Sequence, residues 1–257
     1  MTSILQFAIS LPRKVYGRLQ EMRQGQLKSF GAYLPYVQGK RGLEIGGPSD
    51  IFRQRGVLPI YDAIGSLDNC DFSSSTVWQK HSTQFVFSSG KKPGTTFFAE
   101  GSNLAAISAA SYDVVLSSHN LEHMANPVKA LKEWQRVLKP DAALVLVVPN
   151  YRFTFDHRRE PTSLDHMMSD FECGVGEDDL THLPEILEKH DLTMDRAAGS
   201  KDEFYKRSLN NVSNRCLHQH VFDECNSREL LSAAGFEVLD VECALPFHIC
   251  LLAKVSR

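Results

Sequence analysis

Two nearly continuous apolar stretches with a helical pattern between them constrain the fold of this chain most strongly. The stretches are YDVVLSS at residues 112–118 and AALVLVVP at residues 142–149. Between them, Asn126 is a typical N-cap and Pro127 a typical first residue of a helix. The apolar residues that repeat on one face of that helix are Val128, Leu131, Trp134 and Leu138. Apolar strands that alternate with helices predict an α/β fold, in which helices cover both faces of a parallel sheet.

The other segments extend this alternation. Helices are expected at residues 4–38 with breaks near Pro12 and Pro35, at 49–56, near 183–190, and at 226–234, where Glu229 completes a capping box. Strands are expected at residues 42–46, 57–62, 95–100, 236–242 and 247–255, and residues 63–93 are expected to be irregular. Because the last two strands follow each other directly, we expect the final strand to insert antiparallel. We expect a Rossmann-like, seven-stranded, mostly parallel sheet with helices on both faces.

Residues 150–222 interrupt the alternation of strands and helices. They are polar and rich in His, Asp, Glu and Arg. Because ligands of α/β folds bind at the carboxyl ends of the strands, we expect an inserted polar lid over a substrate site. The alternative is an inert surface insertion. The expected domains are an N-terminal helical cap at 1–40, a cofactor-binding core at 41–149, the lid at 150–222, and the end of the core sheet at 223–257.

The composition is that of an ordinary soluble protein, with 257 residues, 42% hydrophobic residues and a net charge of −3. A charge this small gives no general attraction to nucleic acid or acidic lipid. The six cysteines are scattered and form no C-x-x-C pair, as expected for reduced thiols. The N-terminal apolar run lacks the features of a signal peptide, and no stretch reaches the roughly 20 apolar residues of a membrane span. We therefore expect a cytoplasmic protein whose partner is a small molecule, without nucleic acid or membrane.

The stretch RGLEIGGPSDIF narrows the type of cofactor. A dinucleotide places its pyrophosphate on free N–H groups at a helix N-terminus. Pro48 lacks one such donor, and Asp50 adds a negative charge where the phosphates would lie. S-adenosylmethionine carries no phosphate, and its sulfonium and ammonium groups are cationic, so a nearby carboxylate such as Glu44 is favourable. Gly46 and Gly47 permit a close approach of the ligand, although a tight turn without a ligand would use the same residues.

Several motifs in the right order resemble the class I S-adenosylmethionine-dependent methyltransferases, specifically their type 11 group. They are GLEIGGPS, LPIYD, FFAEG, the block at residues 112–150, and HVFDECNSRELLSAAGFEVLDVE. The GGPS loop and GEDDLTHLPEIL resemble those of a bacterial subgroup. The resemblance implies S-adenosyl-L-methionine as the cofactor, bound by Glu44, Gly46, Gly47, Pro48, Asp62, Glu100 and Ser118. Asp62 is expected to bind the ribose, and Asp68 and Asp71 compete for that role.

Methyl transfer requires alignment of the acceptor with the sulfonium, and a hydroxyl acceptor also requires a base. His119 comes directly after the strand at 112–118, where similar enzymes expose residues toward the transferred methyl group. Its ordinary pKa of about 6.5 suits it to act as that catalytic base, while hydrogen bonding to the cofactor is the alternative role. His123, which lies beside Glu122, is expected to be structural.

The lid supplies the candidate substrate-binding residues, which are His157, Arg158, Arg159, His218 and His220. The arginines, together with Arg215, could bind an anionic substrate through paired hydrogen bonds or could form a surface charge cluster. On a strand, a His-x-His pair points both rings to one face. With an acidic residue such a pair could hold a divalent ion, but we expect hydrogen-bonded histidines and no metal.

The polar character of the lid favours O-methylation of a sugar or a related small metabolite. N-methylation of a small molecule is the alternative within the family. A cofactor-binding or partner-binding relative without activity is the competing class, because the GGPS loop departs from the usual motif. A nicotinamide oxidoreductase is disfavoured by Pro48 and Asp50.

Overall fold

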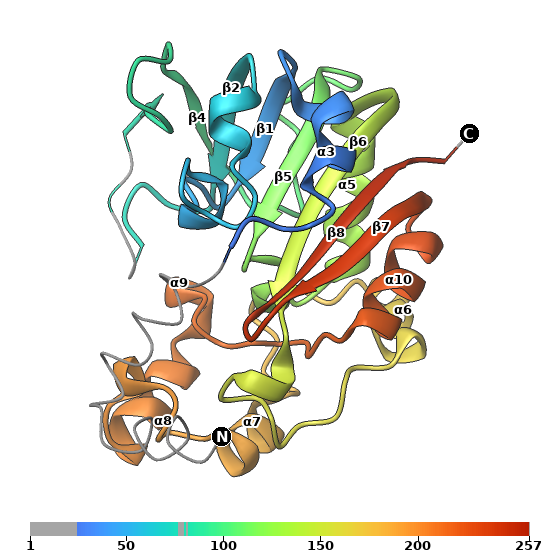
Figure 1. The fold of residues 1–257 in the computed structure, drawn as a ribbon. Helices are drawn as coiled ribbons and strands as arrows, with labels where there is room; N and C mark the ends of the chain where they lie inside the picture. The colour runs from blue at the N-terminus through green and yellow to red at the C-terminus, as the bar shows by residue number, and fades with distance from the viewer. Residues whose placement is uncertain (1–24, 77–79, 81, 257) are drawn as a thin grey trace, which may run out of the picture.

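The computed structural model describes residues 25–76, 80 and 82–256. Within these residues, eight strands form one sheet in the order β3-β4-β2-β1-β5-β6-β8-β7 (Figure 1). The strands are β1 Arg41–Ile45, β2 Ser66–Asp71, β3 Gln84–Phe85, β4 Gly94–Phe98, β5 Tyr112–Ser118, β6 Leu138–Pro149, β7 Phe236–Ala244 and β8 His248–Val255. β1, β2, β4, β5 and β6 are parallel to one another, which confirms the α/β prediction. The sheet has one strand more than predicted, because the two-residue β3 pairs antiparallel with β4.

The described residues form eight α-helices, and some of them cover both faces of the sheet. They are α3 Phe30–Val37, α4 Ile60–Ala63, α5 Pro127–Val137, α6 Leu164–Cys173, α7 Leu183–Lys189, α8 Lys201–Leu209, α9 Asn211–Asn214 and α10 Glu224–Ala233, with 3-10 turns η1 Asp50–Phe52, η2 Leu121–His123, η3 Tyr151–Phe153 and η4 Arg196–Ala198. Side chains of α3 and α4 belong to one apolar cluster, and those of α5 and α10 to another. Val114 and Leu116 of β5 join the first cluster and Val115 joins the second, because successive side chains of a strand alternate. The apolar strands are therefore buried on both faces.

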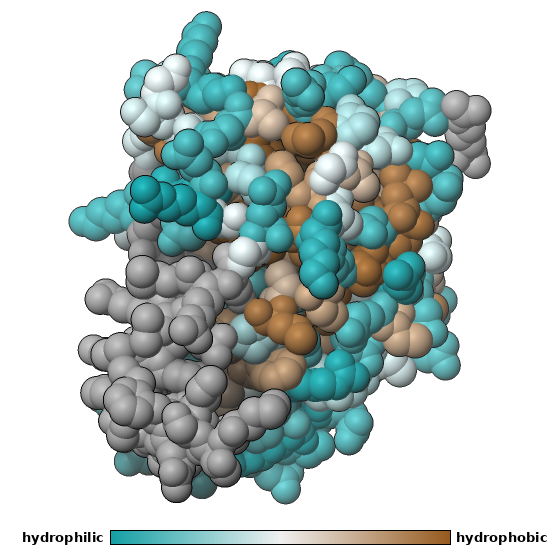
Figure 2. Space-filling view, in the orientation of Figure 1, coloured by the Kyte–Doolittle hydropathy of each residue, from teal (hydrophilic) through white to brown (hydrophobic). Residues whose placement is uncertain are grey.

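The final strand inserts antiparallel, as predicted. β8 lies between β6 and β7 and runs antiparallel to both. β8 is therefore buried between two strands, while β7 forms the edge of the sheet. On the face shown in Figure 2, apolar side chains gather over α3 and the β7–β8 pair, between polar side chains.

The second strand lies later in the chain than predicted. The sequence predicts a strand at residues 57–62, but Ile60 and Tyr61 belong to helix α4 and are buried in the cluster that α3 covers. Strand β2 is instead the polar sequence SLDNCD, inside the segment predicted to be irregular. Its Asp68 accepts hydrogen bonds from Arg41 of the adjacent β1 and from Tyr112 of β5, the strand beyond β1. A prediction from apolar patterning therefore misses β2. This strand is polar, and contacts with distant segments provide the hydrogen bonds of its polar side chains.

Helix α10 begins two residues before its predicted start. Asp223 is its N-cap, and the Asp223 carboxylate accepts from the backbone N–H of Asn226. The Asn226 side chain in turn accepts from the backbone N–H of Asp223. This capping box replaces the one predicted with Glu229, because Asp223 offers a carboxylate in the N-cap geometry.

The N-terminal helical prediction is only partly within the described residues. The predicted break near Pro12 lies outside them, as does most of the predicted cap. Pro35 lies inside α3 rather than breaking it, because the buried Phe30, Tyr33 and Val37 attach that helix to the sheet. Among the helices of the described residues, none combines the length and the apolar character required to cross a bilayer.

Residues 150–222 form a helical lobe at the carboxyl end of β6. The lobe contains α6 to α9, and α7 confirms the prediction of at least one helix near 183–190. It has an apolar cluster of its own, made by Leu183, Ile186, Ala198, Phe204 and Leu217. The lobe is therefore a packed structure with a small core of its own. Its role as a substrate lid stays a prediction.

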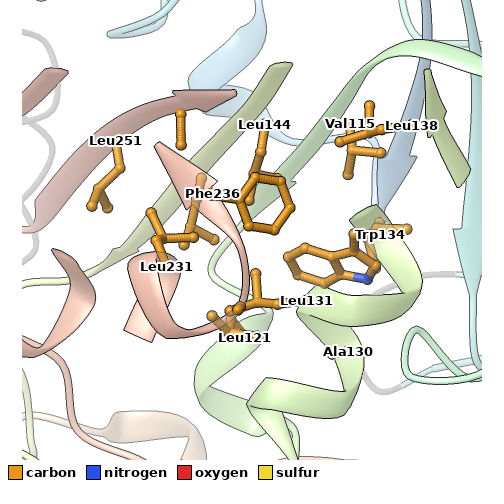
Figure 3. Close-up of a cluster of buried hydrophobic side chains, with 14 of the residues drawn as sticks. Val115, Leu121, Ala130, Leu131, Trp134, Leu138, Leu144, Leu231, Phe236 and Leu251 are labelled. Carbon is orange, nitrogen blue, oxygen red and sulfur yellow. The ribbon is translucent and has the colours of Figure 1, made fainter. Parts of the chain in front are cut away.

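Trp134 of α5 is buried on the α5 side of the sheet, near Leu131 and Phe236 (Figure 3). A substitution at this residue tests the packing on that side. Its indole N–H donates to the carbonyl oxygen of Gly101 at 2.9 Å. Trp134→Phe should lower the free energy of unfolding by about 1–3 kcal/mol, because a buried carbonyl loses its donor and the smaller ring leaves space. Urea denaturation measures this change. Tyr205→Phe, at a half-exposed ring, should change it by less than about 0.5 kcal/mol, and an equal loss in both variants would contradict the expectation.

Candidate functional site

A cavity of about 630 Å³ lies where the carboxyl ends of the parallel strands meet the helical lobe. The segment after β1 contributes Gly46 and Pro48, β2 contributes Asp71, the segment after β4 contributes Glu100, and the segment after β5 contributes His119. The lobe contributes Phe155, Glu177, Arg215 and His218, and the turn before β8 contributes Phe247. Small-molecule sites typically enclose about 300–1,000 Å³. The position and volume of the cavity therefore suit a small ligand at the carboxyl edge of the sheet.

The backbone N–H groups of the loop after β1 donate hydrogen bonds to other groups of the protein. The N–H groups of Gly46, Gly47 and Ser49 donate to Cys70 O at 2.8 Å, Asn69 Oδ1 at 2.9 Å and Tyr61 Oη at 2.7 Å, respectively. Pro48 has no N–H group. A pyrophosphate needs several such donors from the loop and the helix that follows it. This loop therefore fits a ligand that has no phosphate.

Glu44 lies beneath this loop instead of in the cavity wall. Its carboxylate accepts hydrogen bonds from Ser49 Oγ and Tyr61 Oη, both at 2.7 Å. Burial raises the pKa of Glu44 to about 7, although these hydrogen bonds oppose the rise. A Cβ atom at Gly47 would collide with the Glu44 carboxylate, so only glycine fits there. Glu44 and Gly47 thus shape the loop, and Gly46 and Pro48 are the loop residues that face the cavity.

The acidic residues predicted for the ribose occupy different places. Asp71 is at the end of β2 and lines the cavity. Asp62 is exposed on α4 and does not line the cavity, because the predicted second strand is not formed there. Asp68 lies within β2 and is bonded to Arg41 and Tyr112. Of the three candidates, Asp71 is therefore the one that the fold brings to the cavity.

Glu100 and Arg215 form an ion pair on the cavity wall, with 2.5 Å between Oε1 and Nη2. The Arg215 guanidinium also lies over the ring of Phe72, 5.3 Å from its centroid. Glu100 thus lies at the cavity, as the resemblance implies. Ser118, at the end of β5, is buried and is not part of the cavity lining.

His119 faces the cavity and pairs with a histidine that sequence analysis does not single out. Its Nε2 lies 2.7 Å from Nδ1 of His248, at the start of β8. The backbone of His119 has a φ of 49°, a conformation that is uncommon outside glycine and that often marks functional residues. The enclosed surroundings, together with the His248 ring, lower the pKa of His119 well below 6.5. Burial likewise lowers the pKa of His248 to about 4, so both rings are neutral at pH 7.

His218 is oriented by a buried carboxylate. Its Nδ1 lies 2.5 Å from Oδ2 of Asp156, and Asp156 also accepts from the buried Arg159. Burial lowers the pKa of His218, but the Asp156 carboxylate raises it more, so the pKa lies above 6.5. A histidine held at Nδ1 by a carboxylate is the arrangement of a general base, with Nε2 as the proton acceptor. Asp156 belongs to the charged stretch FDHRRE, but nothing in the sequence indicates its pairing with His218, which is 62 residues away.

Glu122 is the most unusual acidic residue of the cavity. It is 1% exposed, and within the described structure neither of its carboxylate oxygens has a hydrogen-bond partner. Its Oε1 lies 3.7 Å from Nδ1 of His119 and 4.0 Å from Nε2 of His123. Burial raises the pKa of Glu122 to about 7. Buried groups with altered pKa values that line a cavity are typical of functional sites.

Three of the candidate substrate-binding residues lie away from the cavity. Arg158 donates to Asp191 at 2.9 Å, and His157 lies 3.8 Å from the same carboxylate, with both side chains on the surface. Arg159 is buried, and its guanidinium donates to Asp156 and to the carbonyl oxygen of His218. Arg159 therefore supports the Asp156–His218 pair, and its donors are not directed at a substrate.

The predicted geometry of the His-x-His pair is wrong. Residues 215–223 form no strand, so the alternation of side chains that would place both rings on one face is absent. His218 lines the cavity, whereas His220 is buried in a separate cluster with His166, Asp170 and His182. The two histidines therefore belong to different sites.

The cavity residues suit a cofactor that has hydroxyl and cationic groups but no phosphate. The carboxylates of Asp71 and Glu100 can accept hydrogen bonds from such groups. The loop N–H groups that a phosphate would require donate within the protein, as described above. This chemical character agrees with S-adenosylmethionine and disagrees with a dinucleotide.

Comparisons with known proteins agree with this fit. The family model described as "Methyltransferase domain" matches residues 19–241, and no curated protein matches the chain. A solved S-adenosylmethionine-dependent methyltransferase from Mesorhizobium loti is 15% identical, with a TM-score of 0.51 and coverage of 88% of this chain and 95% of that one. One from Aquifex aeolicus is 13% identical, with a TM-score of 0.50 and coverage of 93% and 92%.

A third similar structure is 1,6-didemethyltoxoflavin-N1-methyltransferase from Burkholderia thailandensis, with bound 1,6-didemethyltoxoflavin and S-adenosylhomocysteine. It is 13% identical, with a TM-score of 0.49 and coverage of 97% and 85%. The narrower resemblance to the type 11 group and to a bacterial subgroup stays a prediction. The family model spans most of the chain, and the fold and cavity agree with it. The chain therefore belongs to the methyltransferase-domain family, and it is an enzyme whose cofactor is S-adenosylmethionine.

Proposed function

We propose that this enzyme methylates a hydroxyl oxygen of a small polar acceptor, a sugar or a related metabolite. The observation that carries the proposal is the pairing of His218, which lines the cavity, with the buried carboxylate of Asp156. A hydroxyl must lose its proton as it is methylated, whereas an unprotonated amine needs less assistance. A histidine with a raised pKa and a buried carboxylate behind it supplies the proton acceptor that a hydroxyl requires.

The cofactor end of the cavity would be formed by the residues after β1, β2 and β4. Gly46 and Pro48 would contact the ligand on one side, Asp71 would accept hydrogen bonds from the ribose hydroxyls, and Glu100 would lie near the adenine. When bound, S-adenosylmethionine supplies an activated methyl group on a sulfonium. The protein's part is to align the acceptor with that group and to exclude water, and such alignment can account for much of the rate increase.

The acceptor end would be formed by Phe155 and Phe247, with the rings of His119 and His218 between the strands and the lobe. His218 would take the hydroxyl proton at Nε2, and the Asp156 carboxylate would stabilise the resulting imidazolium. His119 has a lowered pKa, which makes it a weaker base, so we assign it to positioning of the acceptor through a hydrogen bond. The polar side chains suit hydroxyl groups, and the two phenylalanine rings suit the apolar face of a sugar ring.

A panel of acceptors tests the proposal through the release of S-adenosylhomocysteine. The acceptors are tested in matched pairs that differ in one group, for example a sugar and its amino sugar. The hydroxyl compound should cause release of S-adenosylhomocysteine, and its product should carry the new methyl group on oxygen. Methylation confined to the amines would support the alternative, an N-methyltransferase. Cofactor binding without turnover for any acceptor would contradict the assignment of a base to His218.

Asp71 and Asp62 provide a direct comparison for the ribose site. Asp71→Asn should weaken S-adenosylhomocysteine binding about 10–150-fold, because hydrogen bonds to a charged partner contribute about 1.5–3 kcal/mol. Asp62→Asn, at an exposed position outside the cavity, should leave the affinity unchanged. Isothermal titration calorimetry measures both affinities. A large loss with Asp62→Asn alone would reverse the two roles.

A further inference from the structure

Three histidines and one aspartate of the helical lobe form a compact cluster outside the cavity. His166 and Asp170 lie one turn apart on α6, His182 is the N-cap of α7, and His220 lies in the segment before α10. One ligand atom from each of the four lies within 4.8 Å of all the others. Nothing in the proposed methyl transfer uses these residues, so the cluster needs a separate explanation.

Two buried polar atoms of this cluster lack hydrogen-bond partners among the described residues. Asp170 is 8% exposed, and its Oδ2 has no hydrogen-bond partner among the described residues, although three imidazoles surround it. His220 is 0% exposed, and its Nδ1 also has no such partner, while its Nε2 lies 3.2 Å from the carbonyl oxygen of Ala125. The same Nε2 also lies 3.7 Å from Oδ2 of Asp170, inside the cluster.

Three separations between the ligand atoms are within about 0.5 Å of those around a tetrahedral ion, and the third is the 3.7 Å between Asp170 and His220. Nε2 of His166 lies 3.1 Å from Nε2 of His182 and 3.4 Å from Oδ2 of Asp170. Zinc–nitrogen and zinc–oxygen bonds of about 2.0–2.2 Å place tetrahedral ligands about 3.3–3.5 Å apart. Imidazole ligands suit zinc, whereas magnesium and calcium prefer oxygen ligands throughout. We propose that His166, Asp170, His182 and His220 bind a structural Zn²⁺ ion.

The ion would join three segments of the lobe that are distant in sequence. It would link α6, the start of α7 and the segment that contains His220. The backbone N–H of His220 donates to the carbonyl oxygen of Glu122 at 3.3 Å, so this segment also contacts the cavity wall. Four protein ligands leave no open position, as in structural zinc sites. The site would therefore stabilise the lobe and the adjoining wall without taking part in the chemistry.

A second group of possible ligands, Glu122, His123 and His218, lies in the cavity itself. In this group Nδ1 of His123 contacts Leu217 O at 3.0 Å and Nδ1 of His218 contacts Asp156, which leaves Nε2 of each ring as the possible ligand atom. The group offers three ligands against four in the lobe cluster. We therefore place the ion in the lobe cluster, and the variants below separate the two locations.

Zinc titration of the full chain tests the site. The protein is treated with EDTA, freed of the chelator, and titrated with zinc chloride in competition with a chromophoric chelator. The wild type should bind one zinc ion per chain. Asp170→Asn and His182→Gln should each weaken binding by at least about 100-fold, because even partners outside the ligand shell contribute 10–100-fold. His157→Gln, at a surface histidine of the same lobe, is the matched control and should bind zinc as the wild type does.

Three results would overturn the site. They are no zinc binding by the wild type, undiminished binding by both cluster variants, or a loss of binding in His218→Gln that the cluster variants do not share. Hydrogen exchange provides a measurement that does not depend on how well the variants fold. In the wild type, zinc should increase the protection of residues 164–173 and 215–222, and an unchanged exchange pattern would contradict a structural ion. Neither measurement depends on methyl transfer, so failure of the zinc site and failure of the proposed function are distinguishable.

Discussion

Gly46→Val is expected to abolish the rise in melting temperature that S-adenosylhomocysteine gives the wild-type protein. Gly46 has a φ of 78°, which β-branched residues rarely adopt, and a Cβ atom there would collide with the side-chain amide of Asn120. Because both residues line the cavity, relief of the collision must displace its wall. A ligand at 100 times its Kd stabilises the native state by about 2.7 kcal/mol, or roughly 5–11 °C for a chain of this size. Thermal unfolding with and without the ligand measures the loss.

Gly90→Val is the matched control for this substitution. Gly90 also has a positive φ, 81°, but a Cβ atom there would meet no atom within 4 Å. The control therefore introduces the same kind of backbone strain outside the cavity, and it should keep the full ligand shift. NAD should give no shift with the wild type, because the loop N–H groups donate within the protein. A shift with NAD, or an undiminished shift in Gly46→Val, would falsify the placement of the cofactor.

His218→Asn should lower the turnover of a hydroxyl acceptor by about 10²–10⁴-fold, the usual contribution of a general base. Asparagine keeps a polar side chain of similar reach but cannot accept the proton. The cofactor should still bind, because His218 lies on the acceptor side of the proposed site. Initial rates at saturating acceptor and the ligand-induced melting shift together measure these two expectations. His157→Asn, at a surface histidine of the lobe, is the control and should retain wild-type turnover.

The pH dependence of the rate separates His218 from His119. A base must be neutral to accept a proton, so activity is lost as the pH falls through its pKa. Asp156 overcomes the effect of burial and holds the pKa of His218 above 6.5, which places the acidic limb of the rate profile above that pH. The lowered pKa of His119 would place the limb well below pH 6.5. Asp156→Asn should move the limb to lower pH, because it removes the charge that raises the pKa of His218.

His119→Asn should leave the position of that limb unchanged while it weakens acceptor binding. This result would agree with a positioning role through the pair with His248. An acidic limb that lies below pH 6.5 and disappears in His119→Asn would instead make His119 the base, as the sequence suggests. The two histidines are therefore distinguishable even if both variants reduce turnover.

The secondary structure of the cofactor-binding part of the molecule could largely be predicted from local sequence. The strand–helix–strand unit at residues 112–149 forms almost as predicted, because its strands are apolar throughout and its helix has a clear N-cap and one apolar face. The exception is β2, whose polar Asp68 gains its partners from Arg41 on the adjacent β1 and from Tyr112 on β5. The prediction of a ribose-binding residue at Asp62 depended on that misplaced strand, and Asp71 occupies the expected position instead.

The sequence by itself indicated the fold class through hydrophobic periodicity and the type of cofactor through the backbone chemistry of a short loop. Its motifs indicated the family by their resemblance to known methyltransferases. Only the tertiary structure decided which groups meet at the acceptor end. His218 and Asp156 are 62 residues apart, and His119 and His248 are 129 residues apart. The first pair depends on how the lobe folds on itself, and the second on the order of the strands in the sheet. Burial and the neighbouring groups together shift their pKa values. Contacts between distant segments leave no periodic pattern in the sequence, so neither the pairs nor their electrostatic environment could be derived before the chain was folded.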